Sequence, residues 1–201
     1  MAKIGILGGS FHPIHNGHFM LGQYCLDHGW VKEVWFIPTG VSYLKAGMKM
    51  LSGEERLRLV ELAIGDNPKM KALDIEIKRS GNTYTYETLQ ELKDQYPEHD
   101  FYFIIGADCL FSIESWYHAE KIFELCHLLV ARRDGKTRGE MRKKARELKE
   151  KYHAKVHLME FEEMEISSTK IREEIKAGRD AADLLPKAVA LEIQKKKYFR
   201  D

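Results

Sequence analysis

The sequence predicts one α/β domain built around a doubly wound, mostly parallel sheet. Short apolar stretches alternate along the chain with segments whose apolar residues have helical spacing, and this alternation is typical of consecutive β-α-β units. Glycine-containing or polar turns follow several of the apolar stretches. Ligands bind at the carboxyl ends of the strands in such a sheet, so these turns are the expected place for a functional site.

Six apolar runs are candidate strands, at residues 3–7, 33–37, 73–77, 101–105, 127–131 and 155–159. The run 101–105 is the most hydrophobic and is expected at the centre of the sheet. The run 73–77 alternates between apolar and charged residues, as in an edge strand with one face in water. Helical spacing predicts helices over residues 19–26, 53–64, 84–96, 113–125, 137–152, 168–177 and 187–197.

These elements predict a Rossmann-like sheet of about five to six mostly parallel strands with helices on both faces. Neither a linker nor a repeat divides the sequence, so we expect a single domain over residues 1–201. Its C-terminal helical part, from about residue 166 to residue 201, is expected to pack against the sheet.

The charge balance gives no reason to expect a nucleic-acid or membrane partner. The chain has 32 Lys and Arg residues against 31 Asp and Glu residues, and no apolar run approaches the length of a membrane span. The first residues lack the layout of a signal peptide. Three scattered cysteines favour reduced thiols in a cytoplasmic protein. The oligomeric state stays open, a homo-oligomer included.

The turn after the first expected strand is the most informative stretch, because residues 8–18 read G-G-S-F-H-P-I-H-N-G-H. Gly8 and Gly9 have no Cβ atom, so the backbone can approach a ligand closely. His15 and His18 are three residues apart at a helix start and can point to the same side. Unpaired N–H groups at a helix N-terminus favour phosphate. Each feature alone is typical of an ordinary turn or cap, but together they indicate phosphate chemistry.

Two other nucleotide-binding motifs do not occur in the sequence. The G-x-G-x-x-G fingerprint is absent, which argues against an NAD-dependent oxidoreductase. Residues 135–137 end like a Walker loop, but Val130 stands where that motif has its first glycine.

Residues 166–172, which read I-S-S-T-K-I-R, predict a second phosphate-binding turn. The first helical turn here carries hydroxyl and basic side chains, although the helix dipole favours acidic residues at that position. Ser168 and Arg172 are four residues apart and share a helical face, so they can form a cradle for a polyphosphate. Alone, this segment would be interpreted as a serine cap beside an exposed arginine. The first motif in the same chain favours the phosphate site.

The two motifs closely resemble the G-G-x-F-x-P-x-H-x-G-H and I-S-S-T-x-I-R signatures of the H-x-G-H nucleotidyltransferase superfamily. With Gly106-Ala107-Asp108 and Trp116 between them, most of the chain resembles the bacterial nicotinate-nucleotide adenylyltransferases. The resemblance implies transfer of the adenylyl group of ATP to nicotinate mononucleotide, giving deamido-NAD and pyrophosphate in NAD biosynthesis.

The resemblance also implies roles for individual residues. The catalytic residues would be His15, His18 and Arg172, with His18 at the reacting α-phosphate. The ATP-binding residues would be Gly8, Gly9, Ser10, Phe11, Gly106, Asp108, Ser168 and Thr169. The nicotinate mononucleotide would be bound by Lys45, Tyr84, Thr85, Trp116 and Arg133, with Trp116 stacked on the pyridine ring. Mg²⁺ would accompany ATP and be held mostly by phosphate oxygens and water, without a protein metal site.

Two kinds of alternative remain open from the sequence. The same chemistry can act on nicotinamide mononucleotide or phosphopantetheine, and sequence does not show the donor geometry that separates these acceptors. A non-catalytic nucleotide-sensing domain on the same scaffold is the other alternative. The presence of His15, His18 and Arg172 favours the enzyme.

Overall fold

The computed structural model describes residues 1–40, 50–132, 137–162 and 165–200. Its sheet has six parallel strands in the order β3-β2-β1-β4-β5-β6. The strands are β1 (Lys3–Gly9), β2 (Glu33–Pro38), β3 (Met70–Ala72), β4 (Asp100–Gly106), β5 (His127–Arg132) and β6 (Val156–Glu162). The chain winds from β1 out to β3 and then returns to place β4 beside β1. The ligand crevice of such a sheet lies at this reversal, outside the carboxyl ends of the two central strands.

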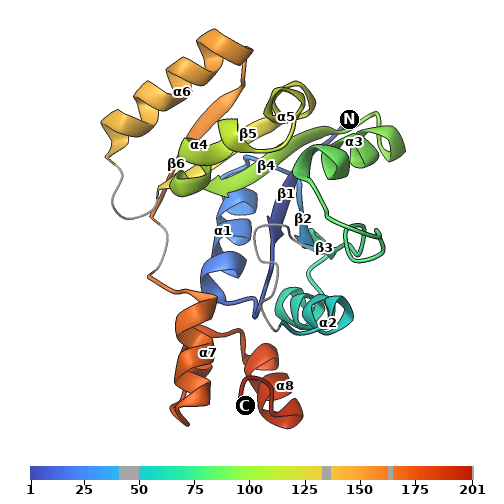
Figure 1. The fold of residues 1–201 in the computed structure, drawn as a ribbon, viewed down its shortest axis with the longest axis vertical. Coiled ribbons are helices and arrows are strands. Elements are labelled where there is room, and N and C mark those ends of the chain that lie inside the picture. The colour runs from blue at the N-terminus through green and yellow to red at the C-terminus, as the bar shows by residue number, and fades with distance from the viewer. Residues whose placement is uncertain (41–49, 133–136, 163–164, 201) are drawn as a thin grey trace.

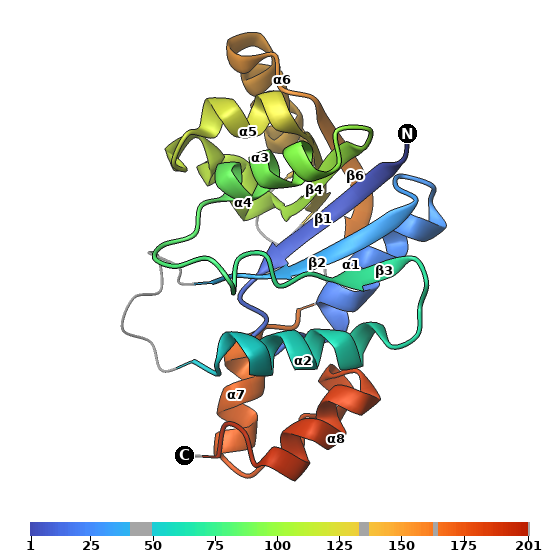
Figure 2. The same cartoon turned by 90° about the vertical axis from the view of Figure 1, so that its right-hand side faces the viewer.

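Helices cover both faces of the sheet, which confirms the expected doubly wound fold (Figures 1 and 2). The helices are α1 (Asn16–Asp27), α2 (Gly53–Ile64), α3 (Thr85–Gln95), α4 (Ala107–Ser112), α5 (Ala119–Leu125), α6 (Arg138–Tyr152), α7 (Ser168–Lys176) and α8 (Lys187–Lys196), with 3₁₀ turns at Ile113–Ser115 and Ala182–Leu184. Successive strand residues point to opposite faces, so Ile6 and Leu7 of β1 enter separate cores. None of the helices named here combines the length and apolar character that crossing a membrane requires.

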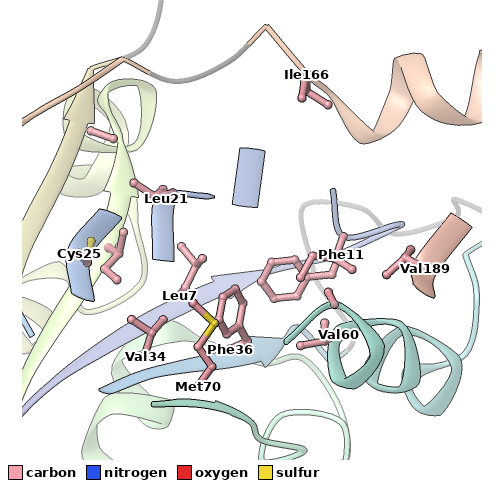
Figure 3. Packing of buried hydrophobic residues seen from close by; sticks show 14 of the residues in the cluster. Leu7, Phe11, Leu21, Cys25, Val34, Phe36, Val60, Met70, Ile166 and Val189 are labelled. Atoms are coloured by element: carbon pink, nitrogen blue, oxygen red, sulfur yellow. The ribbon is translucent and has the colours of Figure 1, made fainter. Parts of the chain in front are cut away.

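The core on the α1 side extends into the turn that follows β1 (Figure 3). Phe11 in this turn is 1% exposed and lies against Phe36 of β2, with ring centroids 6.1 Å apart. Its φ of 42° is in the left-handed region, which is unfavourable for a bulky residue. Packing of the Phe11 ring therefore has to stabilise the backbone of this turn.

The C-terminal helices belong to the same core. α8 lies beside α2 in both views (Figures 1 and 2), and Val189 of α8 is fully buried in the cluster that contains Val60 of α2. Ile166 and Ile171, around the start of α7, are buried in it as well. This apolar contact brings the end of the chain to the turn after β1.

The edge strand lies three residues earlier than the sequence predicts. β3 covers Met70–Ala72 and pairs with residues 34–36 of β2, whereas residues 75–77 form a turn, so the predicted strand at 73–77 is wrong. The reason is Glu76, which is 8% exposed and accepts hydrogen bonds from the Gly40 N–H and the Thr88 hydroxyl. The alternation of apolar and charged residues over 73–77 therefore reflects a buried, hydrogen-bonded carboxylate in a turn and not a strand with one face in water.

The single helix predicted over residues 113–125 is also wrong, because this segment is broken. α4 begins at Ala107, directly after β4, and the chain leaves helical geometry at Trp116 before α5 begins at Ala119. His118 has a φ of 52°, a left-handed conformation that the interior of a right-handed helix does not contain. The break leaves Trp116 half-buried with its ring centroid 6.2 Å from that of Phe103 in β4.

Glu114 connects this broken segment to α6. Its carboxylate accepts hydrogen bonds from Lys144, Lys151 and Tyr152. The hydrogen bonds from Lys144 and then Lys151 lower the pKa of Glu114 from 4.5 to about 2.

We expect Glu114→Gln to lower the free energy of unfolding at neutral pH. The difference from the wild type should shrink as the pH falls from 4.5 towards about 2, because the folded wild-type protein then loses its charged carboxylate. Urea unfolding across this pH range measures the effect, with the exposed Glu150→Gln on α6 as the control. A difference that stays constant down to the lowest pH would contradict the prediction.

Candidate functional site

The turn between β1 and α1 contains the first predicted motif, and both of its histidines lie at the helix start. β1 ends at Gly9, and His15 is the N-cap residue of α1. His15 is 4% exposed, and its ring stacks on that of His18 with centroids 3.7 Å apart and an interplanar angle of 30°. The structure therefore places both imidazoles on one side of the helix, as expected.

A hydrogen bond fixes the tautomer of His18. The backbone N–H of His15 donates to Nδ1 of His18 at 3.3 Å, so Nδ1 is the acceptor nitrogen of this ring. The proton of a neutral His18 is then on Nε2. The edge contact with Phe11, at 5.1 Å between centroids, also fixes the orientation of the ring. His18 is thus a pre-oriented N–H donor beside the glycine-rich turn.

α7 brings the second motif into direct contact with the first. The Ser168 hydroxyl donates to the carbonyl oxygen of Pro13 at 2.9 Å, and Nη1 of Arg172 donates to the carbonyl oxygen of His12 at 2.8 Å. Nη2 of Arg172 donates to the Thr169 hydroxyl at 3.2 Å. Burial lowers the pKa of Arg172 below its ordinary value, and an arginine side chain stays charged at neutral pH. Two segments about 150 residues apart in sequence thus form one site.

A cavity of about 300 Å³ opens beside the glycines, between β1, β2 and α3; we call it the β1–α3 cavity. It brings together five of the residues that the sequence assigned to ligand binding, Gly8, Gly9, Tyr84, Thr85 and Trp116. Hydroxyl groups share this lining with the aromatic rings, which is the mixture that a small polar ring compound requires.

A second cavity, of about 560 Å³, lies on the other side of the turn, and we call it the α7–α8 cavity. His12, Thr169 and Arg172 line it together with basic side chains of the C-terminal helices, among them Lys176 and Lys196. The turn after β1 therefore lies between a cavity with hydroxyl and aromatic groups and a cavity with several basic side chains, which suits a ligand with a polyphosphate chain.

The remaining predicted residues fall into three pairs. Gly106 is the N-cap of α4, and Asp108 is exposed in the first turn of that helix, at the carboxyl end of the strand next to β1. Lys45 and Arg133 lie outside the described residues. The carbonyl group of Ser10 accepts from Arg56, and the side chain of Phe11 belongs to the core, so the Phe11 ring is not accessible to a ligand.

Sequence reasoning missed Arg56 and Glu76, which are 4% and 8% exposed beside the site. The guanidinium of Arg56 donates to the carbonyl oxygens of Ser10, Thr39 and Leu51. A signal was present, because residues 56, 59, 60 and 63 form the buried stripe of α2, and the arginine occupies one of these four positions. A charge inside an otherwise apolar stripe indicates a buried polar partner.

No group of three or more His, Cys, Asp or Glu side chains is arranged to hold a metal ion within residues 1–40, 50–132, 137–162 and 165–200. The donors that converge on the turn after β1 are N–H, hydroxyl and guanidinium groups. N–H, hydroxyl and guanidinium groups are the donors that bind anions such as phosphate.

The fold and these donors together define a doubly wound α/β protein with a candidate phosphate site at the turn after β1. The chain belongs to the cytidylyltransferase-like family, whose profile matches residues 6–174. Among its relatives is a probable nicotinate-nucleotide adenylyltransferase of Lachnoclostridium phytofermentans, 40% identical over 99% of this chain and 100% of the relative. A relative of the same name from Dehalococcoides mccartyi is 40% identical over 98% of this chain and 97% of its own.

A solved structure supports the fold. The nicotinic acid mononucleotide adenylyltransferase of Plasmodium falciparum, in complex with NaAD, superposes with a TM-score of 0.79. The two sequences are 22% identical, and the superposition covers 99% of this chain and 98% of the other. The recognition made from the two sequence motifs is confirmed by these relatives.

The accessibility of the three cysteines gives a test of the β1–α3 cavity. Cys109 lines this cavity and is partly exposed, whereas Cys25 and Cys126 are buried. Burial raises the pKa of both buried thiols to about 12, and the thiol form reacts poorly with alkylating reagents.

We expect iodoacetamide at pH 8 to modify Cys109 before either of the other cysteines. Peptide mass spectrometry over a time course measures the order, and the same reaction in concentrated urea is the control in which all three thiols are accessible. Equal labelling of Cys25 or Cys126 in the folded protein would contradict the described cavity.

Proposed function

We propose that this chain is a nucleotidyltransferase of NAD biosynthesis that transfers the adenylyl group of ATP to nicotinate mononucleotide. The observation that carries the proposal is the pair of hydrogen bonds from Ser168 and Arg172 to the turn that holds His15 and His18. These bonds join the two sequence motifs into one anion-binding site between two cavities. The names of the relatives that are 40% identical over nearly the whole chain agree with this activity.

The proposed reaction needs no protein nucleophile. An oxygen of the acceptor's 5′-phosphate forms a bond to the α-phosphorus of ATP, and the bond from that phosphorus to the α,β-bridging oxygen breaks. Pyrophosphate leaves with the electron pair, and deamido-NAD remains. The protein has to hold two anionic substrates in line and stabilise the charge on the leaving group, and orientation of this kind lowers the barrier by about 7–11 kcal/mol.

On the ATP side, we assign the phosphate contacts to the two motifs. The Nε2–H group of His18 would donate a hydrogen bond to the reacting α-phosphate, and the His15 ring would pack against the His18 ring. Thr169 and Arg172 would hold the triphosphate tail through their side chains, and Ser168, whose hydroxyl donates to Pro13, through its backbone N–H at the start of α7. A guanidinium has five N–H donors, so Arg172 can bind phosphate while it stays bonded to the turn. The backbone of Gly8 to Phe11, together with Gly106 and Asp108, would line the adenosine side.

On the acceptor side, we assign nicotinate mononucleotide to the β1–α3 cavity. Trp116 would stack on the pyridine ring, and stacking of a base on an aromatic ring contributes about 1–3 kcal/mol in single-stranded nucleic-acid sites. Tyr84 and Thr85 lie at the N-terminus of α3, where backbone N–H groups and the threonine hydroxyl suit a carboxylate. Lys45 and Arg133 are proposed as further ligands of the acceptor.

We propose that Mg²⁺ arrives as part of the ATP substrate and not in a site made by the protein. The described residues offer anion-binding donors to the phosphates and no cluster of carboxylate ligands. Phosphate oxygens and water would complete the coordination of the ion, and the bound ion would neutralise part of the phosphate charge.

The proposed function is tested by incubating the protein with ATP, Mg²⁺ and one acceptor at a time. We expect pyrophosphate and deamido-NAD with nicotinate mononucleotide, and slower turnover with nicotinamide mononucleotide and phosphopantetheine. Coupled pyrophosphate release and chromatography of the dinucleotide measure the rates. Nucleotide binding without turnover of any acceptor would refute the enzyme and favour a sensor.

We expect His18→Ala to lower kcat by about 100-fold or more, because loss of one pre-oriented donor to the transition state has effects of this size. The Kd for ATP should change much less, since ground-state binding is shared with the other phosphate ligands. His28→Ala, an exposed histidine at the end of the same helix, is the control and should keep the wild-type kcat. A near-normal kcat in His18→Ala would remove this residue from the chemistry.

A further inference from the structure

The peptide group between Thr39 and Gly40, just after β2, is held from both sides by buried charged residues. Its carbonyl oxygen accepts a hydrogen bond from Nη2 of Arg56 at 2.6 Å. Its N–H, that of Gly40, donates to Oε2 of Glu76 at 3.4 Å. A cation therefore binds the negative end of this peptide dipole and an anion binds the positive end.

Thr39 itself and its partner Arg56 are also attached to the turn after β1. The N–H of Thr39 donates to the carbonyl oxygen of Gly9 at 2.9 Å, and Nη1 of Arg56 donates to the carbonyl oxygen of the next residue, Ser10, at 2.9 Å. Arg56 also donates through Nε to the carbonyl oxygen of Leu51 at 3.2 Å. One side chain thus joins the turn after β1, the turn after β2 and the entry into α2.

Glu76 extends this arrangement to the opposite wall of the β1–α3 cavity. Its Oε1 accepts a hydrogen bond from the Thr88 hydroxyl of α3 at 2.8 Å, and both residues line the cavity together with Thr39. A Cβ atom on Gly40 would lie 2.2 Å from the carbonyl oxygen of Glu76, so no side chain fits at this position. The position of the cavity wall is therefore closely determined.

Burial of the Arg56 and Glu76 side chains costs free energy unless each charged group is hydrogen-bonded. Arg56 is 4% exposed, and burial lowers its pKa while the Glu76 carboxylate acts in the opposite direction. An aliphatic residue at this position of α2 would fill the core stripe without a desolvation penalty. The three backbone contacts of the guanidinium give it a role that an aliphatic side chain cannot perform, because only a planar fork with several donors reaches three carbonyl groups.

We infer that Arg56, with Glu76 as its counterpart, is a positioning residue for the transfer reaction. It holds the wall of the acceptor cavity against the phosphate-binding turn and so sets the distance between the acceptor phosphate and the α-phosphorus. This inference rests on the proposed function for the identity of the two substrates. Arg56 acts only through backbone groups and is not a catalytic residue.

The experiment compares Arg56→Lys, Arg56→Ala and the control Arg58→Ala in the full chain. Arg58 is two residues further along α2, and its side chain is 59% exposed beside Glu61. We expect Arg56→Lys to fold and to lose about 100-fold in kcat, because a misplacement of about 1 Å between reacting groups costs this much. A lysine keeps the charge, but its compact ammonium group does not reproduce the planar fork that spans these three carbonyl groups. Added guanidinium ion should partly restore kcat in Arg56→Ala, and Arg58→Ala should behave as the wild type.

Amide hydrogen exchange supplies a readout that does not depend on turnover. In Arg56→Lys, exchange should become faster at the amides of Thr39 and Gly40 and in the turn after β1, while the thermal midpoint of the folded protein changes little. Arg58→Ala should leave these exchange rates unchanged. Urea at a concentration that matches the added guanidinium in denaturing effect controls for general solvent effects on Arg56→Ala.

Wild-type kcat in a folded Arg56→Lys protein, or unchanged exchange at Thr39 and Gly40, would overturn the inference. The inference would also be overturned if the loss of activity in Arg56→Ala only matched its unfolded fraction and added guanidinium did not restore kcat. If the wild-type protein itself turns over no acceptor, the proposed function fails. The exchange comparison between Arg56→Lys and Arg58→Ala then decides the structural claim by itself.

Discussion

The structure depends on the hydrogen bonds that tie α7 to the turn after β1. The carbonyl oxygens of His12 and Pro13 accept from Arg172 and Ser168, across more than 150 residues of sequence. This turn has a left-handed phenylalanine and a helix start with two stacked imidazoles, and neither arrangement is favourable in an isolated peptide. The hydrogen bonds from α7 and the burial of Phe11 stabilise this backbone conformation in the folded protein. The candidate phosphate site therefore forms only when α7 has docked onto the turn after β1.

The doubly wound sheet explains why this docking creates a site with two sides. β1 and β4 are neighbours at the point where the winding reverses, so helices leave the two strands towards opposite faces. The crevice between them contains the β1–α3 cavity, and the C-terminal helices add the basic α7–α8 cavity across the turn. A reaction that joins two anionic nucleotides has to bring both to one phosphorus atom, and a narrow backbone turn between two cavities meets that requirement. Arg56 and Glu76 fix one of these cavities relative to the turn through a single peptide group.

Much of the fold was predictable from local patterns. α2 has the bounds that the apolar spacing predicts, and Ser52 and Glu55 form a capping box at its start. The central position of β4 follows from its continuous apolar run, because a strand covered on both faces has no place for polar side chains. The predictions for residues 73–77 and 113–125 were wrong where a buried carboxylate and a left-handed histidine interrupt the local pattern. Such interruptions depend on partners distant in sequence, and local spacing does not contain them.

The sequence by itself determined the class of fold, the two phosphate-binding motifs and the family, because glycine, histidine and serine-arginine patterns carry their chemistry at fixed short spacings. It also named five of the residues that line the β1–α3 cavity, namely Gly8, Gly9, Tyr84, Thr85 and Trp116. Only the tertiary structure decided that Arg172 reaches the carbonyl group of His12, that Trp116 leaves its helix to face β4, and that Arg56 is buried against three backbone segments. The physical reason is that a hydrogen bond between distant segments is stable only after the hydrophobic core has brought them together and removed water from around them.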